Sequence, residues 1–88
     1  MNVETQIKTM RQIKMIWDFR GPASQKIAEH HEIHLKDYAQ TENIQPIITG
    51  CTIVSEMYAI AYLVVDESIM TKTREALKPH RGQVYNPN

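Results

Sequence analysis

The segment from Ile13 to Ala76 carries the patterns of a strand, a helix, two strands and a second helix, in that order. Apolar residues occur on both faces of the expected strands. Two helices can cover only one face of such a sheet, and a monomer rarely leaves a large apolar patch exposed to water. We therefore expect a second copy of the chain to cover the other face, in a homodimer.

The first strand is expected at residues 13–19, where large apolar side chains recur at every second position. Residues 47–54 form a β-branched run, and residues 58–65 (YAIAYLVV) follow after a short connection. Tyrosine and alanine fall on opposite faces of this last run. Small alanine side chains allow a helix to approach closely, so we expect the alanine face to lie under the helices. The tyrosine face is then expected to meet the partner chain or a cavity.

Helical periodicity predicts one helix at residues 24–41 and a second at about 67–78, where Pro79 ends it. A short final strand is expected at residues 82–85. The chain is thus predicted to be α+β, with a ferredoxin-like βαββα(β) order and an antiparallel sheet. Residues 1–11 are expected to form a flexible or short helical arm, and residues 12–88 a single domain.

Composition narrows the classes of function. The formal net charge is zero, so the excess of Lys and Arg that displaces counterions from nucleic-acid phosphates is absent, and we expect no nucleic-acid partner. No apolar run approaches the roughly 20 residues needed to span a bilayer, and no secretory signal is recognisable. Cys51 is the single cysteine, as in proteins of a reducing compartment. We expect a cytoplasmic protein without a membrane partner.

The helix pattern of His34 followed by leucine, with Tyr38 one turn later and the strand IITG at residues 47–50, resembles the YCII-like proteins. The paired strands within residues 52–65 resemble the layout of the muconolactone isomerase-like proteins. Both groups belong to the dimeric α/β-barrel superfamily, in which two ferredoxin-like sheets pack face to face. The resemblance implies such a dimer here, and it implies that His34 acts with an acidic residue in proton transfer. This superfamily hosts several unrelated reactions, so the resemblance implies a fold and not a substrate.

His31 lies at the centre of the predicted apolar helix face. A histidine there must satisfy its ring nitrogens or bear the cost of desolvation. One interpretation is a structural histidine bonded to a carbonyl or a tyrosine hydroxyl. The other is a general acid or base at a cavity wall, because the ordinary histidine pKa is near 6.5. We take His31 and His34 as the candidate catalytic residues.

His30 and His34 stand four positions apart on one flank of the same helix, with Asp37 a turn further along. Two imidazoles at this spacing can share Zn²⁺, Ni²⁺ or Cu²⁺, and a carboxylate can complete the site. The alternative interpretation is a row of solvated histidines. No other cofactor is indicated, because glycine-rich phosphate-binding motifs are absent.

Large polar and aromatic side chains could surround an organic ligand. We expect Trp17, Tyr58 and Tyr62 to form the walls of a cavity between sheet and helices, with Arg20 as a further ligand-binding residue. The alternative is that these aromatic residues belong to the core or the dimer interface. The loop at residues 78–82 (KPHRG) could clamp an anion, as could the Asp18 and Arg20 pair, although solvated side chains are the commoner outcome.

Three functions remain open from the sequence. The favoured one is binding, and potentially conversion, of a small organic molecule by histidine acid/base chemistry. The second is a metal-binding or sensing module that uses the helix histidines. The third is a homodimeric interaction protein without catalysis.

Overall fold

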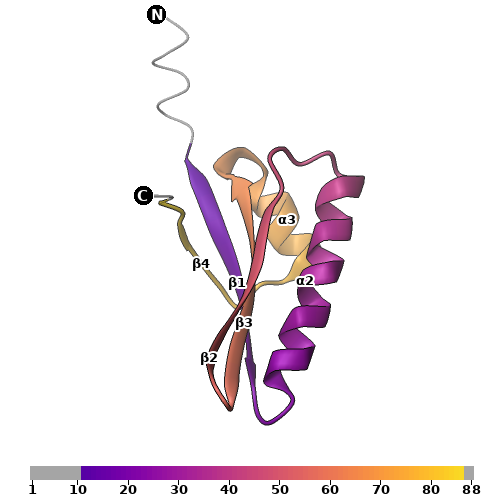
Figure 1. The fold of residues 1–88 in the computed structure, drawn as a ribbon. Helices are drawn as coiled ribbons and strands as arrows, with labels where there is room; N and C mark the ends of the chain where they lie inside the picture. The colour runs from indigo at the N-terminus through magenta and orange to yellow at the C-terminus, as the bar shows by residue number, and fades with distance from the viewer. Residues whose placement is uncertain (1–10, 87–88) are drawn as a thin grey trace, which may run out of the picture.

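A computed structural model describes residues 11–86, which form one antiparallel sheet with both helices on the same face (Figure 1). The α+β class and the predicted final strand are confirmed. No helix within the described residues is both long and apolar enough to cross a membrane. The elements, in chain order, are β1 (Gln12–Arg20), α2 (Ser24–Thr41), β2 (Ile48–Ser55), β3 (Tyr58–Asp66), the 3₁₀ turn η1 (Glu67–Ile69), α3 (Met70–Leu77) and β4 (Arg81–Val84).

The strands are arranged in the order β2-β3-β1-β4. β1 pairs with β3 along its whole length, from Gln12 opposite Asp66 to Arg20 opposite Tyr58, and with β4 on its other side. This arrangement and the βαββαβ order are compatible with the ferredoxin-like fold. How two copies would pack stays a prediction.

The predicted N-terminal arm differs from the structure at its last residue. Arg11 is attached to the domain, because its carbonyl accepts a hydrogen bond from the Glu67 amide at 2.8 Å. The Arg11 guanidinium also contacts the Glu67 carboxylate at 2.8 Å. The rest of the predicted arm, residues 1–10, lies outside the described residues.

The core lies between the sheet and the helices. Odd-numbered residues of β1 and β3 share this face, because Met15 pairs with Leu63 and Trp17 pairs with Ala61. Leu35 of α2 packs against them, and all of these residues are buried. The alanine face therefore lies under the helices, as predicted. The Trp17 indole N–H donates to the Leu77 carbonyl at 2.9 Å, which joins β1 to the end of α3.

The other face of the sheet has no helix on it (Figure 1). Its apolar residues are nevertheless buried: Ile16, Ile60 and Val64 are 2%, 9% and 1% exposed. Long side chains lie across this face. The Lys14 ammonium is 4.2 Å from the centre of the Tyr62 ring, a cation–π contact. A second copy of the chain is therefore not required to remove these apolar residues from water.

Gly50 of β2 explains how Tyr62 can lie flat on the sheet. A Cβ atom at Gly50 would overlap the end of the Tyr62 ring. The absence of a side chain thus provides the space that the ring occupies, and Lys14 closes over the ring from β1.

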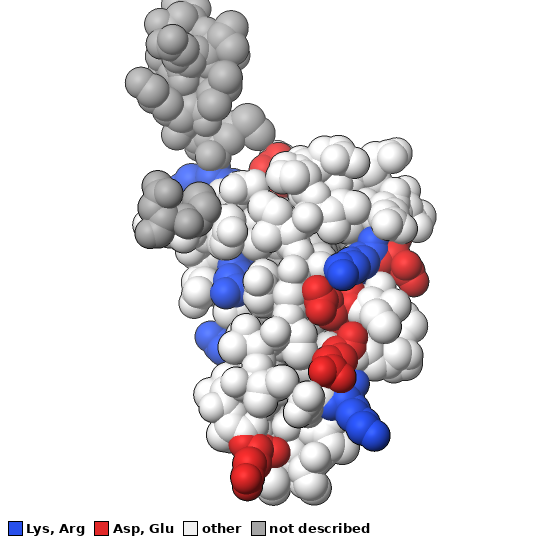
Figure 2. Space-filling model, in the orientation of Figure 1, with Lys and Arg blue, Asp and Glu red and all other residues white. Residues whose placement is uncertain are grey.

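Charges of both signs are mixed on the surface seen in Figure 2, where no single-sign stripe is visible. The β2–β3 hairpin carries three exposed apolar residues, Ile53, Val54 and Met57, beside the acidic Glu56 of its turn. β2 itself contains no charged residue.

Candidate functional site

The structure separates Trp17 from the other three residues predicted to line a ligand cavity, Tyr58, Tyr62 and Arg20. Trp17 faces the helices, since it pairs with Ala61, whereas Tyr58 and Tyr62 lie on the opposite, uncovered face. Arg20 is also on the uncovered face, with its guanidinium 4.0 Å above the Tyr58 ring. The predicted aromatic wall between sheet and helices is therefore wrong. The strand register decides which aromatic residues share a face, and the sequence pattern does not contain that register.

His31 is partly buried and packs against two aromatic rings. Its ring centre lies 5.0 Å from that of Trp17 and 5.3 Å from that of Phe19. Its Nε2 atom is buried and has no hydrogen-bond partner among the described residues. Burial lowers the pKa of His31, and the nearby positive charges that His34, His80 and His30 can carry lower it further. These effects favour the neutral imidazole of this partly buried side chain.

The predicted metal ligands are only partly brought together. The rings of His30 and His34 are 4.7 Å apart in an edge-to-face arrangement. Asp37 does not complete a site with them, since the described part of the chain contains no group of three or more His, Cys, Asp or Glu residues arranged to hold a metal ion. The structure thus shows a histidine pair without a third ligand.

A polar cluster on the uncovered face links three strands. Arg81 of β4 contacts both carboxylate oxygens of Asp18 on β1, at 3.0 Å to Oδ2 and 3.1 Å to Oδ1. The Tyr58 hydroxyl of β3 also donates to Asp18 Oδ1. Hydrogen bonds from Arg81 and Tyr58 hold the pKa of Asp18 at about 2, because both stabilise the carboxylate. The cluster fastens the edge strand β4 to the centre of the sheet.

His80 directly precedes β4, and both its side chain and its backbone form hydrogen bonds with β1. The Asp18 amide donates to His80 Nδ1 at 2.8 Å, and the His80 amide donates to the Ile16 carbonyl at 3.0 Å. An accepting Nδ1 carries no hydrogen, so the neutral ring has its proton on Nε2. His80 Nδ1 also lies 4.0 Å from Asp18 Oδ2.

A cavity of about 260 Å³ opens between α3 and the β1–β4 side of the sheet; we name it the α3 cavity. Gly82 leaves space for this cavity, because a glycine has no side chain to fill it. Arg74 of α3 makes no ion pair with any described residue. The lining residues are Ile13, Met15, Met70, Arg74, Pro79, His80, Arg81 and Gly82.

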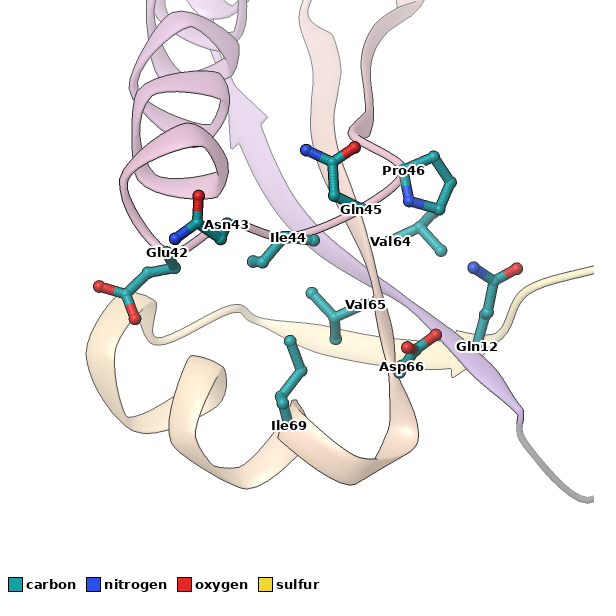
Figure 3. Close-up of a pocket in the computed structure, with 10 residues that line it drawn as sticks. All are labelled: Gln12, Glu42, Asn43, Ile44, Gln45, Pro46, Val64, Val65, Asp66 and Ile69. Atoms are coloured by element: carbon teal, nitrogen blue, oxygen red, sulfur yellow. The ribbon is translucent and has the colours of Figure 1, made fainter. Parts of the chain in front are cut away.

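A second cavity, of about 250 Å³, lies where β3 ends; we name it the β3-end cavity (Figure 3). It is bounded by the connection between α2 and β2, by the last residues of β3 and by η1. Its lining residues are Gln12, Glu42, Asn43, Ile44, Gln45, Pro46, Val64, Val65, Asp66 and Ile69. His31 and His34 line neither cavity.

The sequence pattern did not indicate Arg74 as a site residue, because a single arginine on an amphipathic helix is ordinary. The segment at residues 78–82 was a recognisable signal, since it combines a histidine with cations and a glycine. His80 and Gly82 of that segment do line the α3 cavity. The Arg81 guanidinium instead binds Asp18 on the other face of the sheet.

Comparison with known proteins adds no assignment: no family model matches the chain, and no curated protein or solved structure matches it.

Proposed function

We propose that the protein binds a small organic anion in the α3 cavity. The observation that carries this proposal is the presence of Arg74, which has no ion-pair partner among the described residues, at a cavity with an apolar lining. The partly buried Met70 and Pro79 supply the apolar surface above the buried Ile13 and Met15, so the ligand should combine a hydrocarbon part with an acidic group.

The size of the cavity restricts the ligand. A volume of 260 Å³ corresponds to roughly nine water molecules at about 30 Å³ each. That space suits a short-chain or single-ring acid better than a nucleotide or a peptide. Arg74 can form a charge-assisted hydrogen bond with a carboxylate, which is stronger than a bond between neutral groups.

His80 is the second polar group for this ligand. Its Nδ1 is occupied by the Asp18 amide, so its Nε2–H is the donor left for other partners. His80 is therefore proposed as a hydrogen-bond donor to the acidic group of the ligand and not as a proton-transfer group, because its Nδ1 lone pair is held by the Asp18 amide.

The test is a titration with hexanoate and hexanol, followed by NMR of the methyl groups of Ile13, Met15 and Met70. We expect hexanoate to bind more tightly than hexanol, and Arg74→Gln to weaken hexanoate binding at least about tenfold, because a charge-assisted bond is lost. Gly82→Val should also prevent binding. A Cβ atom at Gly82 would meet Ile13 Cγ2 at 3.5 Å, an ordinary contact, so the strand can accept a side chain at this position.

Gln83→Val is the matched control, because residue 83 pairs with Lys14 and residue 82 with Met15, on opposite faces of β4. This variant should bind hexanoate like the parent protein. Equal binding of hexanoate and hexanol, or unchanged binding in Arg74→Gln, would contradict the proposal.

A second candidate function is self-association through the edge of β2. This strand is eight residues long, has no charged residue, and has no neighbouring strand on one side. Edge strands are usually protected by charges, proline or a short length. β4, the other edge, has only four residues and includes Arg81. A second copy of β2 would satisfy the unpaired backbone groups without charge repulsion.

Native mass spectrometry should therefore show a dimer for the parent protein and a monomer for Ile53→Lys. Ile53 is on the helix side of β2, opposite Ala59, so the added charge affects edge pairing and not the uncovered face. Gln83→Lys, on the uncovered face of β4, should remain dimeric. The reverse pattern would support face-to-face packing of the sheets, and a monomeric parent protein would exclude both arrangements.

A further inference from the structure

We propose that His30 and His34, on an exposed flank of α2, form a chelating site for Cu²⁺. The inference rests on the separation of the two imidazole rings and on their freedom from other polar partners. It concerns a surface away from the α3 cavity, which neither histidine lines, and it does not depend on the proposed anion site.

The two rings are separated as two neighbouring ligands of one metal ion require. Residues four positions apart on a helix lie above one another on the same flank. The ring centres of His30 and His34 are 4.7 Å apart. An imidazole nitrogen binds a transition metal at about 2.0–2.1 Å, which puts the ring centre roughly 3 Å from the ion. Two rings with this separation therefore enclose nearly a right angle at a shared ion.

Both side chains are free to turn towards an ion. His30 and His34 are exposed. Within residues 11–86, neither ring makes a hydrogen bond or an ion pair. The rings meet edge to face, and rotation of these exposed side chains can direct one nitrogen of each towards the same point. Metal binding therefore breaks no polar contact of the fold.

His31, between these two residues in sequence, does not belong to the site. Its ring packs against Trp17 and Phe19, on the side of α2 that faces the sheet. Its Nε2 atom is buried, so an ion on the surface of the helix cannot reach that nitrogen. The protein ligands are therefore one nitrogen from His30 and one from His34.

A set of two imidazoles favours Cu²⁺ over Zn²⁺. Zinc sites in proteins use three or four protein ligands. The described part of the chain has no group of three or more His, Cys, Asp or Glu residues arranged to hold a metal ion. Cu²⁺ accepts a tetragonal set of nitrogen and oxygen ligands, and a given site binds it more tightly than other divalent first-row ions. Two imidazole nitrogens, with water at the remaining positions, provide such a set.

The charges along this flank nearly cancel. Lys26 lies one turn before His30, and Asp37 lies one turn after His34. Neither Lys26 nor Asp37 forms an ion pair with a described residue. An ion held between them is attracted by one and repelled by the other, so its affinity should come from the two imidazoles.

The experiment is a titration of the full chain, without an affinity tag, with Cu²⁺. Electron paramagnetic resonance counts the imidazole nitrogens bound to the ion, and we expect two. His30→Gln and His34→Gln should each weaken binding at least about tenfold, because each removes one ligand of the chelate. Both positions are exposed, so circular dichroism of these variants should match that of the parent protein.

A shifted histidine pair is the matched control. Lys26 is exposed and stands four positions before His30. Lys26→His combined with His34→Gln therefore rebuilds a pair with the same spacing one turn earlier on α2. We expect this double variant to recover the Cu²⁺ affinity that is lost in His34→Gln alone.

Three results would overturn the inference: a single bound imidazole in the parent protein, unchanged binding in either single variant, or no recovery in the double variant. None of these results concerns hexanoate binding in the α3 cavity, whose lining includes neither His30 nor His34. The two proposals can therefore fail separately.

Discussion

Replacing Leu63 by alanine should lower the free energy of unfolding by about 3 kcal/mol, within the range of about 2–5 kcal/mol for buried leucines. Leu63 is 0% exposed in the central strand β3, where it pairs with Met15 and Thr49, and its loss leaves a cavity beneath α2. For a domain of this length the melting temperature should fall by roughly 12–24 °C. Urea unfolding followed by circular dichroism measures the effect.

Val54→Ala is the control for this prediction. Val54 also belongs to the sheet but is 55% exposed, so its substitution removes little buried surface. We expect a change of at most about 0.5 kcal/mol. A loss below about 1 kcal/mol in Leu63→Ala would show that Leu63 is not part of a tightly packed core.

The second large effect is expected at Asp18. Hydrogen bonds from Arg81 and Tyr58 lower the pKa of Asp18 from its ordinary value of 3.8 to about 2. A carboxyl group whose pKa is lower in the folded state stabilises the fold above its unfolded-state pKa, and this stabilisation is lost as the pH falls. The loss should occur between about pH 4 and pH 2. Since the Asp18 side chain is 19% exposed, solvent screening limits the contribution to about 1–2 kcal/mol.

Asp18→Asn should therefore be less stable than the parent protein at pH 7 by about 1–2 kcal/mol. Its free energy of unfolding should also change less between pH 4 and pH 2, because the titrating group is absent. Urea unfolding at several pH values measures both quantities. Asp37→Asn is the control, since Asp37 forms no ion pair with a described residue. Parallel pH profiles for Asp18→Asn and the parent protein would contradict the assignment.

The elements of the fold could be predicted because their signals are local. Alternation over residues 13–19 and 58–65 follows from the two-residue repeat of a strand, and the observed β1 and β3 include these segments. The contrast between tyrosine and alanine in β3 identified the helix-facing side, since only small side chains permit close approach. Helical periodicity is less reliable for a single position: it places Ile27 on the same face of α2 as Leu35, yet Ile27 is 47% exposed.

The need for a partner on the uncovered face could not be judged from the sequence. Apolar residues such as Ile16 and Val64 are buried there without a helix layer. Tyr62 lies flat because Gly50 on the neighbouring strand leaves room, and Lys14 covers the ring. These contacts join three strands, so they depend on register and not on any local pattern.

The amino-acid sequence by itself determined the order of strands and helices, the α+β class and the side of β3 that faces the helices, because these depend on neighbouring residues and their periodicity. The tertiary structure alone decided which side chains meet. It placed Trp17 with His31 and away from Tyr58, joined Asp18 to Arg81 across 63 positions, and formed both cavities between elements distant in sequence. Such contacts are set by strand register and by the packing of helices on the sheet, which no short segment encodes.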